Sequence, residues 1–167
     1  MSKGSSSAII ILNKAIEHSP EYADAYYWRG IAKEDLKDSK GAIADFNKVI
    51  QLKPDDADAY YWRGKLKMEL DYFNGGISDF NKAIEFKPGF HPYYFMIWNK
   101  IGLSISANAN EEKIKLLESA LLDLNKAKNF VEEEGEYEKL VDQEQKTLNI
   151  FQTIKKKLIS QPKMTKD

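Results

Sequence analysis

The sequence predicts an all-α protein built from repeated helix-turn-helix units, and three observations support this fold class. Residues 23–56 and 57–90 are identical at 19 of 34 aligned positions, so the chain contains a duplicated unit. Within each unit, apolar residues recur at spacings of three and four, which is typical of a helix with one buried face. A Lys-Pro pair closes each unit, because proline cannot continue the helical hydrogen-bond ladder. A chain of 167 residues, 43% of them hydrophobic, is long and apolar enough to bury a core.

Each duplicated unit is predicted to contain two helices. The first begins at Asp24 or Asp58, since an acidic side chain is favourable at the positive end of a helix, and it runs to about Leu36 or Leu70. The second covers about residues 40–52 of the first unit. Its apolar residues fall on one face and are Ile43, Phe46, Val49 and Ile50.

The period of 34 and the residues at fixed positions within it resemble the tetratricopeptide repeat. In both units an arginine replaces the family's leucine and a lysine replaces its second aromatic residue, while Gly76 stands where a small alanine is usual. The resemblance implies a short right-handed solenoid of stacked helix pairs. The motif positions are Tyr26, Arg29, Gly30, Lys33, Ala42, Phe46 and Pro54, then Tyr60, Arg63, Gly64, Lys67, Gly76, Phe80 and Pro88.

The resemblance extends to both sides of the two clear repeats, so the array is expected to cover residues 8–134. Residues 8–20 are similar to the second helix of an earlier repeat whose first helix is missing. Residues 91–130 are similar to a degenerate third repeat, with an insertion near residues 104–112 that is expected to enlarge its turn. The motif positions of its first helix are expected at Tyr94, Ile97, Trp98 and Ile101.

The two ends of the chain are predicted to differ. Residues 1–7 are rich in Gly and Ser, which indicates a flexible N-terminus or an engineered scar. Residues 136–159 carry apolar residues along one side and are expected to form a C-terminal capping helix, because the last unit of a repeat array needs a cover. The polar residues 160–167 are expected to form a flexible tail.

Composition argues against most kinds of chemistry. A net charge of -1 disfavours nucleic acid as a partner, and the absence of cysteine excludes disulfides and thiolate metal sites. His18 and His91 are far apart in the sequence. The segment with Asp55, Asp56 and Asp58 lacks the glycine and distal glutamate of a calcium loop. The sequence therefore predicts no enzyme, metal or cofactor, and the absence of a long apolar run predicts a cytoplasmic protein without a membrane span.

The resemblance also implies where a partner binds, because first helices in this family line a concave groove that holds a partner segment. Tyr27, Trp28, Tyr61 and Trp62 are large and rigid, as peptide-binding hot spots often are. The alternative is that the indole rings pack across the repeat boundary, with the arginines stacked on them. The groove candidates are Asp24, Tyr27, Trp28, Ile31, Glu34, Asp58, Tyr61, Trp62, Lys65, Met68, Phe95, Met96 and Asn99.

These residues predict a non-enzymatic interaction module that binds a peptide segment of a partner protein. Two alternatives are a small dedicated chaperone for a secreted or assembling client, and the regulatory arm of a larger enzyme or complex. The groove positions lack the Lys, Asn and Arg set with which some family members hold a chaperone's terminal carboxylate. Residues 8–20 add a second hypothesis, self-association, since a lone second helix leaves Ile9, Ile10, Ile11 and Ile16 partly uncovered.

Overall fold

The structure, a computed structural model, describes residues 3–134, 149, 152, 153, 155–157, 159 and 160, and these residues contain helices and turns but no β-strand. The predicted all-α class is therefore confirmed. The chain forms two compact units, Met1–Pro88 and Gly89–Asp167.

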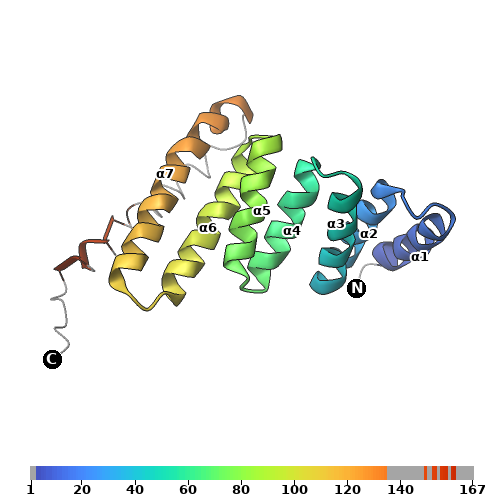
Figure 1. Cartoon of the computed structure of the whole chain (residues 1–167), viewed down its shortest axis with the longest axis horizontal. Helices are drawn as coiled ribbons and strands as arrows, with labels where there is room; N and C mark the ends of the chain where they lie inside the picture. Colours follow the sequence, from blue (N-terminus) through green and yellow to red (C-terminus); the bar gives the residue numbers. More distant parts are fainter. Residues whose placement is uncertain (1–2, 135–148, 150–151, 154, 158, 161–167) are drawn as a thin grey trace. The chain divides into compact units, whose positions relative to one another are not determined.

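The first unit is a row of helices in which each helix packs against the next along the chain (Figure 1). The two helices predicted in each repeat are present, with ends within about two residues of those expected. The elements are α1 (Lys3–His18), α2 (Ala23–Asp35), α3 (Ser39–Leu52), α4 (Ala57–Glu69) and α5 (Phe73–Phe86).

Local backbone chemistry fixes the ends of these helices. Asp38 accepts a hydrogen bond from the Gly41 amide at 2.9 Å at the start of α3, and Asp56 accepts one from the Ala59 amide at 2.8 Å at the start of α4. The cap of α4 is thus Asp56, two residues before the Asp58 expected to open this helix. Lys37 and Asp71 follow α2 and α4 with φ of 64° and 61°, the left-handed conformation common just after a helix.

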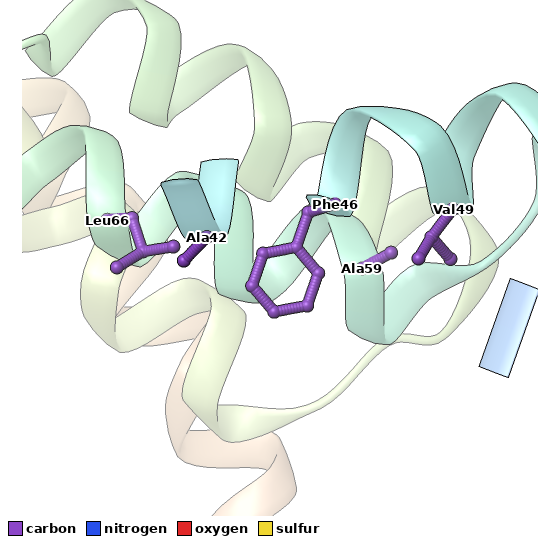
Figure 2. Close-up of a cluster of buried hydrophobic side chains, with 5 residues drawn as sticks. All are labelled: Ala42, Phe46, Val49, Ala59 and Leu66. Carbon is purple, nitrogen blue, oxygen red and sulfur yellow. The ribbon is translucent and has the colours of Figure 1, made fainter. Parts of the chain in front are cut away.

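A phenylalanine packed on a glycine holds each helix pair of the first unit together. Phe46 and Phe80 are fully buried, and a Cβ placed on Gly30 or Gly64 would lie 3.0 Å from the Cζ of the facing ring. Glycine at these positions therefore lets the two helices of a repeat approach closely. Figure 2 shows the cluster around Phe46, where Ala42 and Val49 of α3 lie with Ala59 and Leu66 of α4.

The arginine and lysine that depart from the family motif bind one buried carboxylate. Arg29 donates two hydrogen bonds to Asp45, at 2.9 and 2.6 Å, and Lys33 lies 2.7 Å from the same carboxylate. Arg29 also donates to Asn13 of the preceding helix at 2.8 Å. The second repeat has the same arrangement, with Arg63 and Lys67 on Asp79 and with Asn47. The idea that these arginines stack on tryptophan is wrong, because their guanidinium groups lie over the rings of Tyr26 and Tyr60.

The second unit contains one described helix pair, α6 (Phe90–Ser106) and α7 (Asn110–Glu134), packed through Ile97, Ala120 and Leu124. The prediction of a large turn at residues 104–112 is wrong. α6 has 17 residues where α4 has 13, and α7 has 25 where α5 has 14. The inserted residues continue both helices, and the connection at 107–109 is as short as that at 70–72.

The first helix of the third repeat is shifted by one residue from the expected register. The helix cap after α3 is Lys53 and the next helix begins at Ala57, whereas the cap after α5 is Lys87 and α6 begins at Phe90. Lys100 therefore takes the place of Lys67 and binds Asp123, as Lys67 binds Asp79. In the same register Ile97, rather than Trp98, takes the place of Gly64. Ile97 is larger than the glycine of the clear repeats, and Leu124, which packs against it, is smaller than their phenylalanine.

The N-terminal residues differ from the sequence prediction. Residues 3–7 belong to α1, so the expectation of a flexible segment over residues 1–7 is wrong for this part. The Ser5 hydroxyl donates to the Asp35 carboxylate of α2, which is a tertiary contact for the first turn of α1. Most of the proposed capping helix at 136–159 and of the tail at 160–167 lies outside the described residues.

Candidate functional site

The helices α2 and α4, which are the first helices of the two clear repeats, are joined by side chains that were predicted to line the groove. The Trp62 indole donates a hydrogen bond to the Tyr27 hydroxyl at 3.0 Å. The Lys65 ammonium lies 3.0 Å from Glu34 and 4.7 Å from the centre of the Trp62 ring. These contacts fix α2 and α4 side by side. We call the surface formed by Tyr27, Glu34, Tyr61, Trp62, Lys65 and Met68 the α2–α4 face.

Each side chain of the α2–α4 face is partly exposed, so the face offers contact area to a ligand. The Tyr61 ring packs edge-on against Trp62 and Phe80, with centroid distances of 5.6 and 6.1 Å. The Tyr27 ring packs in the same way on Phe46. Rings held at their edges lose little conformational entropy when a ligand covers their faces.

Burial changes the acid-base properties of one residue in this face. Desolvation raises the pKa of Tyr27, and the hydrogen bond from Trp62 opposes part of this effect. The phenol therefore stays neutral at physiological pH and accepts the indole hydrogen bond.

The two tryptophans of the duplicated segment have different surroundings. Trp62 is half-buried against α2, as the packing alternative expected, whereas Trp28 is 59% exposed. Trp28 and Ile31 line an open cleft of about 530 Å³ between α2 and α1. The walls of this α1–α2 cleft also include Gly4, Ala8 and Leu12 of α1. Trp28 and Ile31 therefore contribute to the α2 wall of this cleft, and Ile31 also packs against the buried cluster of α3 and α4.

Asp24 and Asp58 lie at the edge of the first helices and form exposed ion pairs. Asp24 lies 2.7 Å from Lys53, and Asp58 lies 3.8 Å from Lys87. The hydrogen bond to Asp24 raises the pKa of Lys53. Such exposed pairs contribute little to stability.

Two of the three groove candidates in α6 are core residues. Met96 is 3% exposed and Asn99 is fully buried, so their assignment to a groove surface is wrong. The cause is the one-residue register shift of α6, which aligns Asn99 with Leu66 of the hydrophobic core. In the corrected register, Tyr61, Trp62 and Lys65 correspond to Tyr94, Phe95 and Trp98.

The sequence prediction did not include Tyr94 and Trp98 among the surface residues of α6. It included Phe95, but aligned it one position away from its place in the structure. The Trp98 side chain is 38% exposed and lies edge-on to Tyr94 at 6.2 Å. The shorter spacing from Lys87-Pro88 to the next helix is the sequence signal for this shift.

Within the described ranges, no group of three His, Asp or Glu side chains is arranged to hold a metal ion. No helix in the described part of the chain combines the length and the apolar character needed to span a bilayer. The arrangement offers apolar, aromatic and ion-paired contact area, which suits binding.

Comparisons with known proteins agree with this geometry. The family model described as TPR repeat matches residues 35–71, and the model described as tetratricopeptide repeat matches residues 57–90. The chain is similar to the crystal structure of MamA protein, with 26% identity and a TM-score of 0.67 over 80% of this chain and 68% of that chain.

Two further solved structures share the fold. TTC0263, a thermophilic TPR protein of Thermus thermophilus, has 20% identity and a TM-score of 0.60, over 65% of this chain and 56% of its own. YrrB, described as a TPR protein with an unusual peptide-binding site, has 23% identity and a TM-score of 0.59, over 74% of this chain and 58% of its own. A search of the curated proteins gave no match.

Proposed function

Since the chain is a tetratricopeptide repeat protein, we propose that it is a non-enzymatic interaction module that binds a peptide segment of a partner protein on the α2–α4 face. The observation that carries this proposal is the bond from Trp62 to Tyr27 across the two helices, together with the Lys65–Glu34 pair. These contacts hold the face in one arrangement before any ligand arrives, which lowers the entropic cost of binding.

The side chains of the face also suggest what kind of segment binds. Tyr61 and Met68 offer apolar contact, which favours a segment with apolar or proline side chains. Lys65 and Glu34 already neutralise each other, so the face does not select strongly for charge. The proposed ligand is therefore an extended or helical peptide with an apolar stripe.

A peptide array tests this proposal with the natural chain and the Tyr61→Ala and Met68→Ala variants. We expect each variant to bind the selected peptides at least about tenfold more weakly, as is typical of a hot-spot residue. Tyr22→Ala is the matched control, because Tyr22 is 51% exposed and lies outside the α2–α4 face. Circular dichroism confirms that the variants stay folded. Equal binding by the natural chain, both variants and the control would exclude this face as the site.

We also propose that the chain self-associates through α1. Ile10 and Ile11 of this helix are 60% and 67% exposed, and adjacent exposed isoleucines favour an interface. Sedimentation velocity over a wide concentration range tests this proposal, and a constant monomer mass would contradict it.

A further inference from the structure

The α1–α2 cleft occupies the place that a first helix takes in a complete repeat. Ala8 and Leu12 of α1 correspond to Ala42 and Phe46 of α3, the second helix of the next repeat. In that repeat, Ala42 and Phe46 pack against a first helix. These two residues line the cleft together with Trp28. In the complete repeat, the equivalent Trp62 bonds to Tyr27 of the preceding first helix. Trp28, at the equivalent position, is 59% exposed.

The cleft wall at Ile31 and the exposed surface of α1 at Ile11 differ from a complete repeat at two positions that bind charges. Asp45 and Asp79, which bind arginine and lysine, correspond to Ile11 in α1. Lys65, which pairs with Glu34 of the preceding first helix, corresponds to Ile31. A helix that carried an arginine like Arg29 would therefore bring an unpaired charge onto Ile11, which is costly. Ile31 in the cleft wall and Ile11 on α1 therefore both favour an apolar partner surface.

α1 itself offers such an apolar surface. Residues 8–12 are five consecutive apolar residues, so α1 is apolar on every side over this segment, and such a helix is normally buried all round. α2 covers one side, while Ile10 and Ile11 stay exposed. Lys14 of α1 and Asp35 at the rim of the cleft are both exposed and of opposite charge.

We infer that the occupant is α1 of a second copy of this chain. In a two-fold arrangement, each α1 enters the cleft of the other copy, so one contact covers both clefts and both exposed isoleucine pairs. Gly4 and Ala8 are small and allow the two α1 helices to approach closely. This inference rests on the self-association proposed above and adds the element that fills the cleft.

Sedimentation velocity on the 167-residue chain tests the inference with one substitution on the exposed surface of α1 and one on the α2 wall of the cleft. Ile11→Asp restores the acidic residue of the complete repeats on α1, and Ile31→Lys restores the lysine on α2. Lys65 occupies the position equivalent to Ile31 in a folded repeat, so Ile31→Lys is compatible with folding. Ile105→Asp is the matched control, since Ile105 is 76% exposed and belongs to α6.

We expect Ile11→Asp and Ile31→Lys each to raise the dimer dissociation constant at least about tenfold at unchanged helicity, while the control leaves it unchanged. If the natural chain is monomeric throughout, both the self-association and this inference are wrong. If a dimer forms and Ile31→Lys does not weaken it, self-association stands and the seating of α1 in the cleft is overturned. A dimer that is weakened equally by the Ile105→Asp control would also overturn it.

Discussion

Asp38 and Tyr72 hold equivalent positions in neighbouring repeats, but only Asp38 caps its helix. Asp38 bonds to the Gly41 amide, whereas Tyr72 at the start of α5 makes no side-chain cap bond and is 60% exposed. Tyr72→Asp should therefore supply a missing cap. We expect it to raise the free energy of unfolding by about 1 kcal/mol, measured by urea denaturation. Asp38→Ala is the reverse control and should lower it by a similar amount, and a loss of stability in Tyr72→Asp would contradict the capping argument.

Asn99 is a buried amide in a position where the preceding repeat has a leucine. Its Nδ2 donates to the Phe95 carbonyl at 2.8 Å, but its Oδ1 has no hydrogen-bond partner among the described residues. An unpaired buried polar atom costs about 1–3 kcal/mol. Asn99→Leu, which copies Leu66, should therefore raise the free energy of unfolding by about 1 kcal/mol in urea denaturation. Asn81→Leu, at an exposed position of α5, should change it by less than about 0.5 kcal/mol.

The tryptophans show what residue identity alone cannot predict. Trp28 and Trp62 lie in identical eight-residue segments, so any local argument treats them alike. Their environments differ because Trp62 has a first helix before it and Trp28 has a cleft. The sequence established that both rings belong to first helices, but the exposure of each ring depends on the neighbouring element.

At the scale of elements, the buried carboxylate that joins the helices of a repeat should dominate the charge contributions. Asp45 binds Arg29 and Lys33, and only 4% of its side chain is exposed. Asp45→Ala removes the carboxylate that both cations bind, and since both are partly hydrated we expect a loss of about 2–3 kcal/mol of unfolding free energy. Asp24→Ala, which removes an exposed pair with Lys53, should lower the free energy of unfolding much less. Urea denaturation measures both, and equal losses would contradict the argument.

The contact between α2 and α4 should depend on pH in a defined direction. The pKa of Tyr27 is raised above its ordinary value, mainly by desolvation, so the folded state keeps the phenol proton more tightly than the unfolded state does. The resulting stabilisation is fully present below about pH 10 and is lost as the pH rises through the higher folded-state pKa. Tyr27→Phe should cost about 1 kcal/mol near pH 8 by removing the acceptor for Trp62.

The difference in unfolding free energy between the natural chain and Tyr27→Phe should therefore shrink above about pH 10. Denaturation at two pH values measures this change. Tyr22→Phe is the control for loss of an exposed phenol. A difference that grows with pH would mean that the Tyr27 hydroxyl stabilises the folded state in its ionised form.

Element types and most boundaries could be predicted from the sequence, because the duplication and the proline stops repeat a clear pattern. The third repeat shows the limit of this approach. Its period was extrapolated as 34, but the connection before α6 is one residue shorter, so Met96 and Asn99 were placed on the surface. The polar insertion was assigned to a turn because Ser and Asn are common in turns, yet its residues extend α6 and α7. Tertiary packing decided both outcomes.

At the scale of the whole molecule, the two units differ in the interactions that hold their helices. The first unit has two copies of the arginine–lysine–aspartate cluster and of the glycine–phenylalanine contact. The described part of the second unit is held by Ile97, Ala120 and Leu124, with the Lys100–Asp123 pair. Stability in repeat proteins is approximately a sum over units and their nearest neighbours, so local opening should follow this difference.

Hydrogen exchange followed by mass spectrometry should therefore find the slowest amides in α2, α3 and α4, each of which packs against the helix before it and the helix after it, and faster exchange in α6 and α7. Asp45→Ala should accelerate exchange mainly in α2 and α3, which its carboxylate joins. Asn99→Leu should slow exchange in α6, because it removes the unpaired amide oxygen from that helix. Equal protection of α6 and α3 in the natural chain would mean that the clusters of the first unit do not determine which part opens first. In that case the longer helices of the second unit would compensate for the smaller number of specific contacts among its described residues.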